Sequence, residues 1–174
     1  ATAAADYSGL ASTATLELNG ALNATATVNN AQSSVKLSGA IAAAGIIAAK
    51  SGTTNTLNLA VSLDQTNDIE TSGFTTINLT NANTNAAALS LTGGAFTATG
   101  ATLNISGAGD ITLGAAAAEP VLSKIVATNA TGNITAFLNT AKVLSFTGGS
   151  GNDAITSPTA VATTVNGGDG IDTL

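Results

Sequence analysis

The chain has 174 residues, with ten acidic residues against four lysines and a formal net charge of −6. It contains no Arg, His, Cys, Met or Trp. These absences exclude a Ser-His-Asp or Cys-His nucleophile, zinc, haem and iron–sulfur sites of the usual kinds, and any disulfide. An acidic chain with so few cations cannot neutralise a row of phosphates, so we expect no nucleic-acid partner.

The length fits one domain. The longest apolar run, residues 40–49, is about half as long as a membrane-spanning helix requires, so we expect no transmembrane segment. The large side chains are mostly aliphatic and thinly spread, with 3% aromatic residues in all. This composition favours a narrow core built from short strands.

Short alternations of apolar and small polar residues recur along the whole chain. This period of two predicts strands with one apolar face and one face of Asn, Thr or Ser. Thr and Val also favour strands, and Gly, Asn or Asp closes the stretches. In chain order they are residues 16–18, 35–37, 57–63, 77–79, 89–91, 103–105, 111–113, 125–126, 134–137 and 143–146.

The spacing of these stretches suits either a β-sandwich or a β-solenoid. Many stretches are only three to five residues long, their turns lack Asn-Gly hairpin signals, and the large residues can form ladders of like side chains. We therefore predict an all-β fold, a parallel β-solenoid or β-roll with irregular coils. Its parts are N-terminal coils over 1–50, an irregular solenoid over 51–146 and glycine-rich turns over 147–174, all in one continuous solenoid.

Two alanine-rich segments are the candidates for helix. Residues 40–50 have the composition for about two helical turns, since Ala is the best helix former. Residues 115–118, followed by Glu119 and Pro120, suit a loop with a helical turn. Each is interpreted as an insertion or cap packed against the coils, with a partner-binding helix as the alternative.

A specific motif stands near the end of the sequence. Residues 148–156 read Gly-Gly-Ser-Gly-Asn-Asp-Ala-Ile-Thr, which fits the calcium-binding nonapeptide G-G-x-G-x-D-x-U-x at every fixed position. A second copy begins at Gly167, 19 residues after Gly148. The intervening stretch carries no acid and suits the opposite side of a coil, so we expect the two motifs to stack on one edge.

The residue types of the motif match the needs of a hard cation. Ca²⁺ takes six or more oxygens from carboxylates and carbonyls, and glycines let the backbone turn tightly and aim carbonyls inward. We predict a Ca²⁺ ion between stacked coils, with Asp153 and Asp172 as side-chain ligands. The loop-shaping residues, which also offer carbonyls, are Gly149, Gly151, Gly168 and Gly170. The alternative is a pair of Gly-rich turns in which Asp is only a turn residue.

Other acids are weaker candidates. Asp169 occupies a motif position that usually contributes its backbone, and Asp110 follows a degenerate Gly-x-Gly at residues 107–109. Asp64, Asp68 and Glu70 lie within seven residues of one another and form either a solvated loop or a further Ca²⁺ site. A catalytic carboxylate pair among them is not expected, because a polysaccharide hydrolase also needs aromatics for sugar stacking and the chain has one Tyr.

The two nonapeptides, together with the stretch over residues 70–84, give the chain a resemblance to RTX-type surface-layer proteins of Gram-negative bacteria, such as Caulobacter and Campylobacter. The resemblance implies a calcium-dependent β-solenoid exported by type I secretion to the cell surface. It further implies self-assembly into a lattice and contact with outer-membrane polysaccharide through regions outside this sequence. Because Leu174 falls inside a repeat, we expect the sequence to be a fragment of a longer protein.

Three functions follow from these residues. The first is a structural, non-enzymatic component of a surface layer that folds and assembles with calcium outside the cell. The second is a stalk segment of an RTX adhesin, and the third is the non-catalytic C-terminal part of a secreted RTX enzyme. For the first function, a chain that is loose at submicromolar cytosolic calcium is expected to fold on export.

Overall fold

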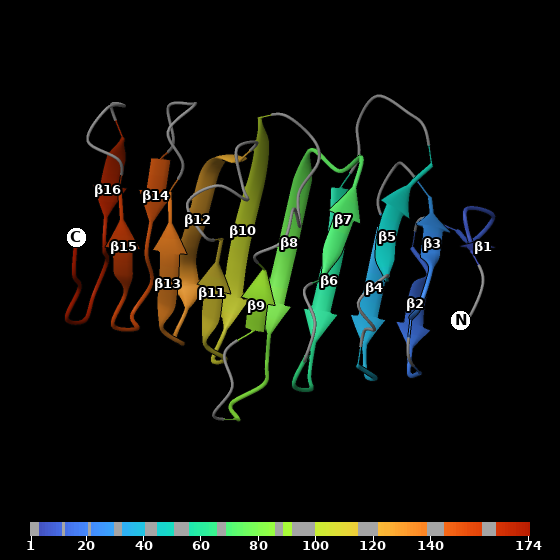
Figure 1. Cartoon of the computed structure of the whole chain (residues 1–174), viewed down its shortest axis with the longest axis horizontal. Helices are drawn as coiled ribbons and strands as arrows, with labels where there is room; N and C mark the ends of the chain where they lie inside the picture. Colours follow the sequence, from blue (N-terminus) through green and yellow to red (C-terminus); the bar gives the residue numbers. More distant parts are fainter. Residues whose placement is uncertain are drawn as a thin grey trace.

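The computed structural model describes residues 4–11, 13–20, 22–29, 33–40, 45–50, 56–65, 69–85, 89–91, 100–114, 122–138, 145–157 and 163–174. The regular secondary structure of these residues consists of β-strands alone (Figure 1). None of them belongs to a helix long and apolar enough to cross a membrane. The strands are β1 (Ala5–Asp6), β2 (Thr15–Leu18), β3 (Thr25–Val28), β4 (Ser33–Leu37), β5 (Ile46–Ala49), β6 (Thr56–Val61), β7 (Glu70–Ser72), β8 (Thr76–Asn81), β9 (Leu89–Leu91), β10 (Ala101–Gly107), β11 (Ile111–Leu113), β12 (Leu122–Ala130), β13 (Ile134–Phe137), β14 (Ser145–Thr147), β15 (Ala154–Thr156) and β16 (Thr164–Asn166).

The strands alternate between the two sides of a coil. Within the described residues, the even-numbered strands form one eight-stranded sheet, and the odd-numbered strands form two four-stranded sheets, β1 to β7 and β9 to β15. The pairings between these strands are all parallel. Coils therefore stack along the long axis of the molecule, with the N- and C-terminal ends far apart (Figure 1). The predicted parallel β-solenoid is confirmed.

The core is made of columns of aliphatic side chains from successive coils. Leu57, Ile77 and Leu103 occupy matching positions of β6, β8 and β10, and each is at most 2% exposed. The residues between them along each strand face outward and are half-buried or exposed. The predicted period of two and the predicted ladders of like side chains are therefore present.

The alanine-rich segment after residue 45 does not form the predicted helix. Ile46–Ala49 is strand β5, which pairs with β3 on one side and β7 on the other. Ile46 and Ile47 are β-branched and suit a pleated strand, and two rows of ladder hydrogen bonds outweigh the helix preference of the alanines. Residues 41–44 and the second candidate, residues 115–118, lie outside the described residues.

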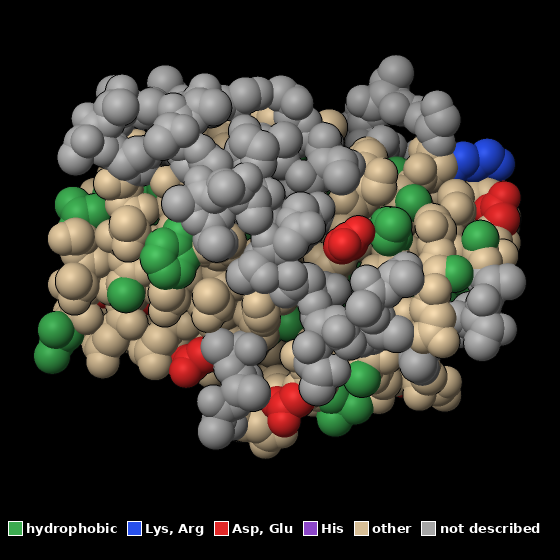
Figure 2. Space-filling view, viewed as in Figure 1, with side chains coloured by type: hydrophobic (Ala, Val, Ile, Leu, Met, Phe, Trp, Pro, Cys, Tyr) green, Lys and Arg blue, Asp and Glu red, His purple; other side chains and the backbone are tan. Residues whose placement is uncertain are grey.

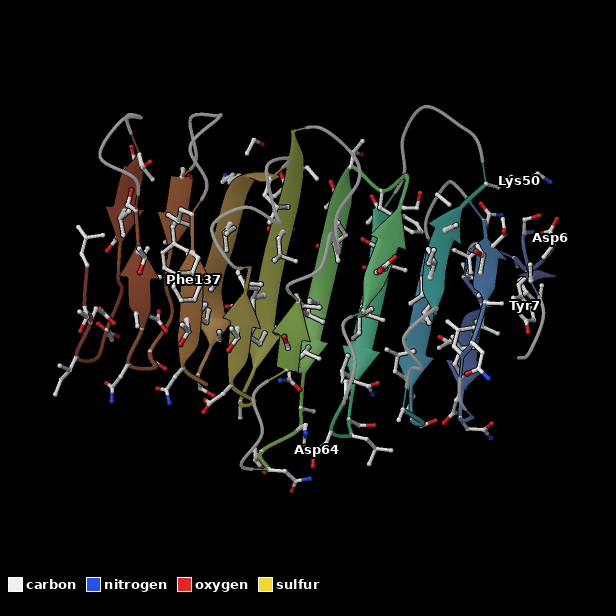
Figure 3. All side chains as sticks on the ribbon, viewed as in Figure 1. Asp6, Tyr7, Lys50, Asp64 and Phe137 are labelled. Atoms are coloured by element: carbon white, nitrogen blue, oxygen red, sulfur yellow. The ribbon has the colours of Figure 1, made fainter. Side chains whose placement is uncertain are left out.

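One edge of the solenoid carries the connections that lead from each even-numbered strand to the next odd-numbered one. We call it the turn edge, and it is the lower edge in Figure 1, where Figure 3 labels Asp64. From β10 onward its connections are short, comprising residues 108–110, 131–133 and 148–153. The eight-stranded sheet runs from β2 to β16, so the turn edge brings the end of the chain into line with earlier coils.

Candidate metal centre

The two nonapeptides stack on the turn edge, one coil apart, as the sequence predicts. The amide of Asp169 donates a hydrogen bond of 2.8 Å to the carbonyl of Gly149, and the amide of Thr173 donates one of 2.8 Å to the carbonyl of Asp153. Between the motifs, β16 adds the next strand to the eight-stranded sheet, on the side of the coil opposite β15. The carboxyl groups of Asp153 and Asp172 therefore belong to consecutive coils of one column.

Asp153 is the most deeply buried acid among the described residues, with an exposed fraction of 2%. Its Oδ1 accepts a hydrogen bond of 2.8 Å from the amide of Ile134, one coil earlier. Its own amide donates 2.9 Å to Oδ1 of Asp172, one coil later. The same side-chain-to-backbone link thus joins three consecutive coils.

The second carboxylate oxygen of Asp153 has no partner. Oδ2 is the one buried side-chain oxygen or nitrogen of the described residues that makes no hydrogen bond. It lies close to residue 148, where only glycine fits. A Cβ at Gly148 would overlap both Oδ2 of Asp153 and the carbonyl oxygen of Gly167. Two acceptor oxygens, one of them unpaired and buried, therefore lie close to Gly148, and a cation bound to them would stabilise this arrangement.

Asp172 repeats this geometry one coil later. A Cβ at Gly167 would overlap Oδ2 of Asp172, as a Cβ at Gly148 would overlap Oδ2 of Asp153. Unlike Asp153, Asp172 is exposed. A carboxylate and a main-chain oxygen converge at Gly148, and the carboxylate of Asp172 lies against Gly167. Such oxygens are the donors that Ca²⁺ prefers, so these residues fit a calcium ion.

The electrostatics of Asp153 reflect its burial. Burial raises the pKa of the Asp153 carboxyl, and the negative charge of Asp172 acts in the same direction. The backbone amides of Ile134 and Gly149 oppose the rise in pKa. A divalent cation would favour the ionised form, because an opposite charge close by lowers a carboxyl pKa.

The motif glycines serve two different purposes. Gly168 and Gly170 have φ angles of 97° and 113°, which side chains rarely permit. Gly149 and Gly151 do not have positive φ. They are required by close stacking instead, because a Cβ would overlap the carbonyl oxygens of Ala130 and Gly132 in the coil before.

The two weaker motif candidates are placed differently from Asp153. Asp169 is exposed, and its amide takes part in coil stacking. Asp110 aligns with Asn133, one residue before the column of Asp153, and its Oδ1 accepts 2.7 Å from the Asn133 amide. The missing residue in its degenerate motif accounts for this shift.

Sequence reasoning missed the asparagines beside the aspartate column. The side chains of Asp110, Asn133 and Asn152 each accept a hydrogen bond from a main-chain amide of the next coil, at 2.7, 2.7 and 2.9 Å. The signal was the recurrence of Gly-Asn at residues 132–133 and 151–152, 19 residues apart. A third copy of the turn, with Ile134 in place of the aspartate, therefore precedes the two motifs.

The acids near residue 64 do not form a second cluster among the described residues. Asp64 accepts hydrogen bonds from the side-chain amides of Asn83 and Asn85, and Glu70 lies on β7. Asp68 lies outside the described residues. No group of three acids in the described part of the chain could hold a metal, and on the face in Figure 2 the acids are spread out. The candidate centre at Asp153 instead combines carboxylates with main-chain oxygens.

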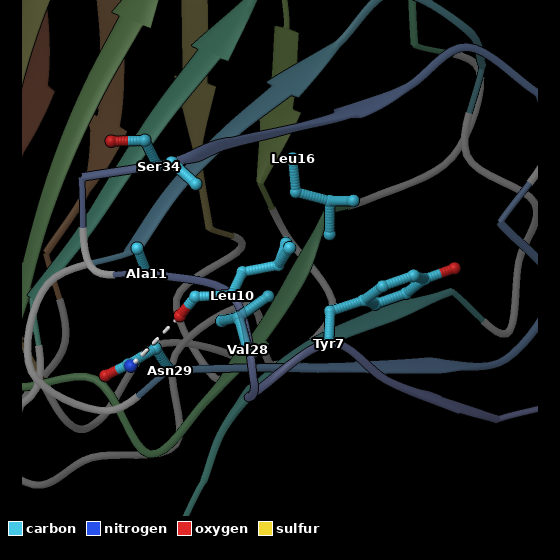
Figure 4. A pocket seen from close by; sticks show the side chains of 8 residues that line it. Tyr7, Leu10, Ala11, Leu16, Val28, Asn29 and Ser34 are labelled. Carbon is cyan, nitrogen blue, oxygen red and sulfur yellow. Dashed lines mark hydrogen bonds between the residues drawn. The ribbon is translucent and has the colours of Figure 1, made fainter.

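A separate small cavity lies at the N-terminal end. It has a volume of about 10 Å³ and is lined by Tyr7, Leu10, Leu16 and Val28 among others, with Asn29 bonded to the Leu10 carbonyl at 3.3 Å (Figure 4). A space of this size holds at most one water molecule, so it does not form a ligand site.

Comparisons with protein-family models, curated proteins and solved structures found no match to this chain.

Proposed function

We propose that this chain is a calcium-stabilised structural segment of a bacterial surface layer, secreted by a Gram-negative cell and assembled on its exterior. In this proposal it has no catalytic role. Calcium binds at the turn edge and holds the last coils of the solenoid together, which makes the segment rigid where calcium is millimolar.

The proposal is carried by one observation, the buried and unpaired Oδ2 of Asp153. Leaving such an oxygen without a partner costs free energy, and charged groups cost more than neutral ones. The carbonyl oxygen of Gly167 also lies close to Gly148. The Gly149 amide acts on the Asp153 carboxyl, but no described group makes a hydrogen bond to Oδ2. A calcium ion would supply the missing positive charge.

In the proposed site each residue has a defined task. Asp153 contributes the buried carboxylate, and its Oδ1 is held in place by the Ile134 amide. Gly167 contributes a carbonyl from the next coil, and Asp172 contributes a second negative charge. The glycines at 149 and 151 let the coils approach closely enough for oxygens of two turns to share one ion.

The adhesin stalk and the non-catalytic part of a secreted enzyme use the same calcium site. They differ from the surface-layer role in what the whole protein assembles into. We favour the lattice because the coils of this chain differ from one another in sequence, whereas adhesin stalks tend toward near-identical tandem repeats.

Thermal unfolding with calcium and with chelator tests the site. With a Kd on the order of 10⁻⁴ M, millimolar Ca²⁺ would stabilise the protein by about 1.4 kcal/mol per site, which raises the midpoint by several degrees. Asp153→Ala should lose this rise. Asp6→Ala removes an equal charge at the opposite end of the solenoid and should keep the calcium-dependent rise in midpoint.

Calorimetric titration provides the direct measurement. We expect calcium binding to the wild-type chain and to Asp6→Ala, and none at this site in Asp153→Ala. Equal midpoints for the wild-type protein in calcium and in chelator, with no heat of binding, would refute the proposed site.

A further inference from the structure

The turn edge is stabilised in two different ways along the solenoid. In the earlier coils, buried side-chain amides fill the interior of the turns. Asn81, 1% exposed, donates 3.0 Å to the carbonyl of Asp110, and its Oδ1 accepts 3.1 Å from the amide of Asn83. Both polar atoms of this buried side chain are therefore paired inside the protein.

Gln65 is a second case of the same kind. It is 8% exposed, and its Nε2 lies 3.3 Å from the carbonyl of Gly39, one coil earlier, and 3.5 Å from that of Leu63. Asn83, also 8% exposed, donates its amide to Asp64. An amide can satisfy a carbonyl because it carries its own N–H donors, and such turns need no ion.

In the last coils a carboxylate occupies the turn interior instead. Asp153 can only accept hydrogen bonds when ionised. Its Oδ2 makes no hydrogen bond, and the nearby Gly167 carbonyl is a further acceptor. In the amide-containing turns the buried polar atoms find hydrogen-bond partners within the protein. In the turn with the carboxylate, a buried oxygen lacks a positive or donor partner.

The apolar core changes at the same place. The column that contains Asp153 holds Leu89, Ile111 and Ile134 in the preceding coils, each at most 3% exposed. A buried aliphatic side chain contributes about 1.5–3 kcal/mol, which the aspartates do not supply. Beyond Phe146, Ile155 is the one buried large aliphatic of the described residues, at 4% exposed.

We infer that the solenoid has a built-in boundary: the coils up to β13 fold without metal, and only the turns and strands from β14 onward require calcium. The inference rests on the proposed calcium site and goes beyond it by assigning the calcium dependence to one end of the molecule. It also replaces the expectation that the whole chain is loose without calcium. The metal-free coils act as the surface on which the calcium-dependent coils are ordered.

Hydrogen exchange of the full chain, read by mass spectrometry, tests the boundary. In chelator, peptides from β6, β8, β10, β12 and β13 should be protected as strongly as in millimolar Ca²⁺. Peptides covering β14 to β16 should exchange at least about tenfold faster in chelator. Loss of protection along the whole chain in chelator would overturn the boundary.

Two substitutions at one position separate the boundary from the calcium site itself. Asp153→Asn places an N–H donor toward the Gly167 carbonyl, as Asn81 does toward Asp110. In this variant β14 to β16 should be protected in chelator, and calcium should change nothing. Asp153→Ala should leave them unprotected in both conditions.

The outcomes of these variants are distinct. If Asp153→Asn exchanges as fast as Asp153→Ala, the interpretation that an amide replaces the ion is wrong, while the calcium site still stands. If calcium changes the hydrogen exchange of no wild-type peptide, both the calcium site and the boundary are refuted.

Discussion

At the scale of single residues, the position of each side chain on the coil matters more than its type. Asp110 and Asp153 both follow glycines on the turn edge. Asp110 lies one residue before the column of Ile134 and Asp153, and its carboxylate accepts a hydrogen bond from one backbone amide. Asp153 lies in that column, and its Oδ2 has no hydrogen-bond partner. Only the second arrangement leaves a buried carboxylate oxygen without a hydrogen bond among the described residues.

Replacing a motif glycine tests the stacking argument. Gly149→Ala should lower the free energy of unfolding by about 1–3 kcal/mol, because its Cβ would overlap the Ala130 carbonyl and force the backbone to move. Gly20→Ala is the matched control, since a Cβ there meets nothing within 4 Å, and it should stay within about 0.5 kcal/mol of wild type. Denaturant unfolding in calcium measures both, and equal values for the two variants would contradict close stacking.

At the scale of strands, the eight-stranded sheet is stabilised on both of its faces. Its inner face is aliphatic, and its outer face carries a ladder of asparagines in β6, β8 and β10. Asn78 donates 2.7 Å to Asn58 and accepts 2.7 Å from Asn104. Amide ladders suit a parallel in-register stack because each side chain both donates to one neighbour and accepts from the other.

Removing the middle of this ladder should cost more than removing an exposed polar side chain. Asn78→Ala breaks two half-buried hydrogen bonds and leaves a group of Asn58 and one of Asn104 unpaired, at a cost of about 1–3 kcal/mol. Thr128→Ala, at an exposed position of β12, is the control and should be near neutral. Urea unfolding in chelator reports the difference, and an Asn78→Ala protein as stable as wild type would show that the ladder contributes little.

At the scale of the whole molecule, the solenoid is a one-dimensional stack in which each coil contacts its neighbours. Stability in such a stack is close to a sum over coils and interfaces, so one end can depend on calcium while the rest does not. These properties suit a building block of an ordered array.

Electron microscopy of the protein in millimolar calcium tests the proposed assembly. Ordered two-dimensional sheets are expected with calcium and should disappear in chelator and in Asp153→Ala, because the C-terminal coils lose their order. Isolated rods under all conditions would favour the stalk function over the lattice.

The amino-acid sequence by itself determined the strand period, the parallel solenoid and the stacking of residues 148–153 on residues 167–172. These features are local or strictly periodic, so the pattern of apolar residues and glycines is sufficient to predict them. It did not predict β5, because pairing with β3 and β7 outweighs the helix preference of its alanines.

Only the tertiary structure decided which carboxylate is buried and unpaired. The shorter motif of Asp110 sets it apart in the sequence, but Asp153 and Asp172 look alike there. Only the structure shows that Asp153 is buried and Asp172 is exposed. The sequence also did not predict that the side-chain amides of Gln65 and Asn81 fill the interior of their turns. Their partners lie a full coil away along the chain, and hydrogen bonds at that separation exist only once the coils are stacked.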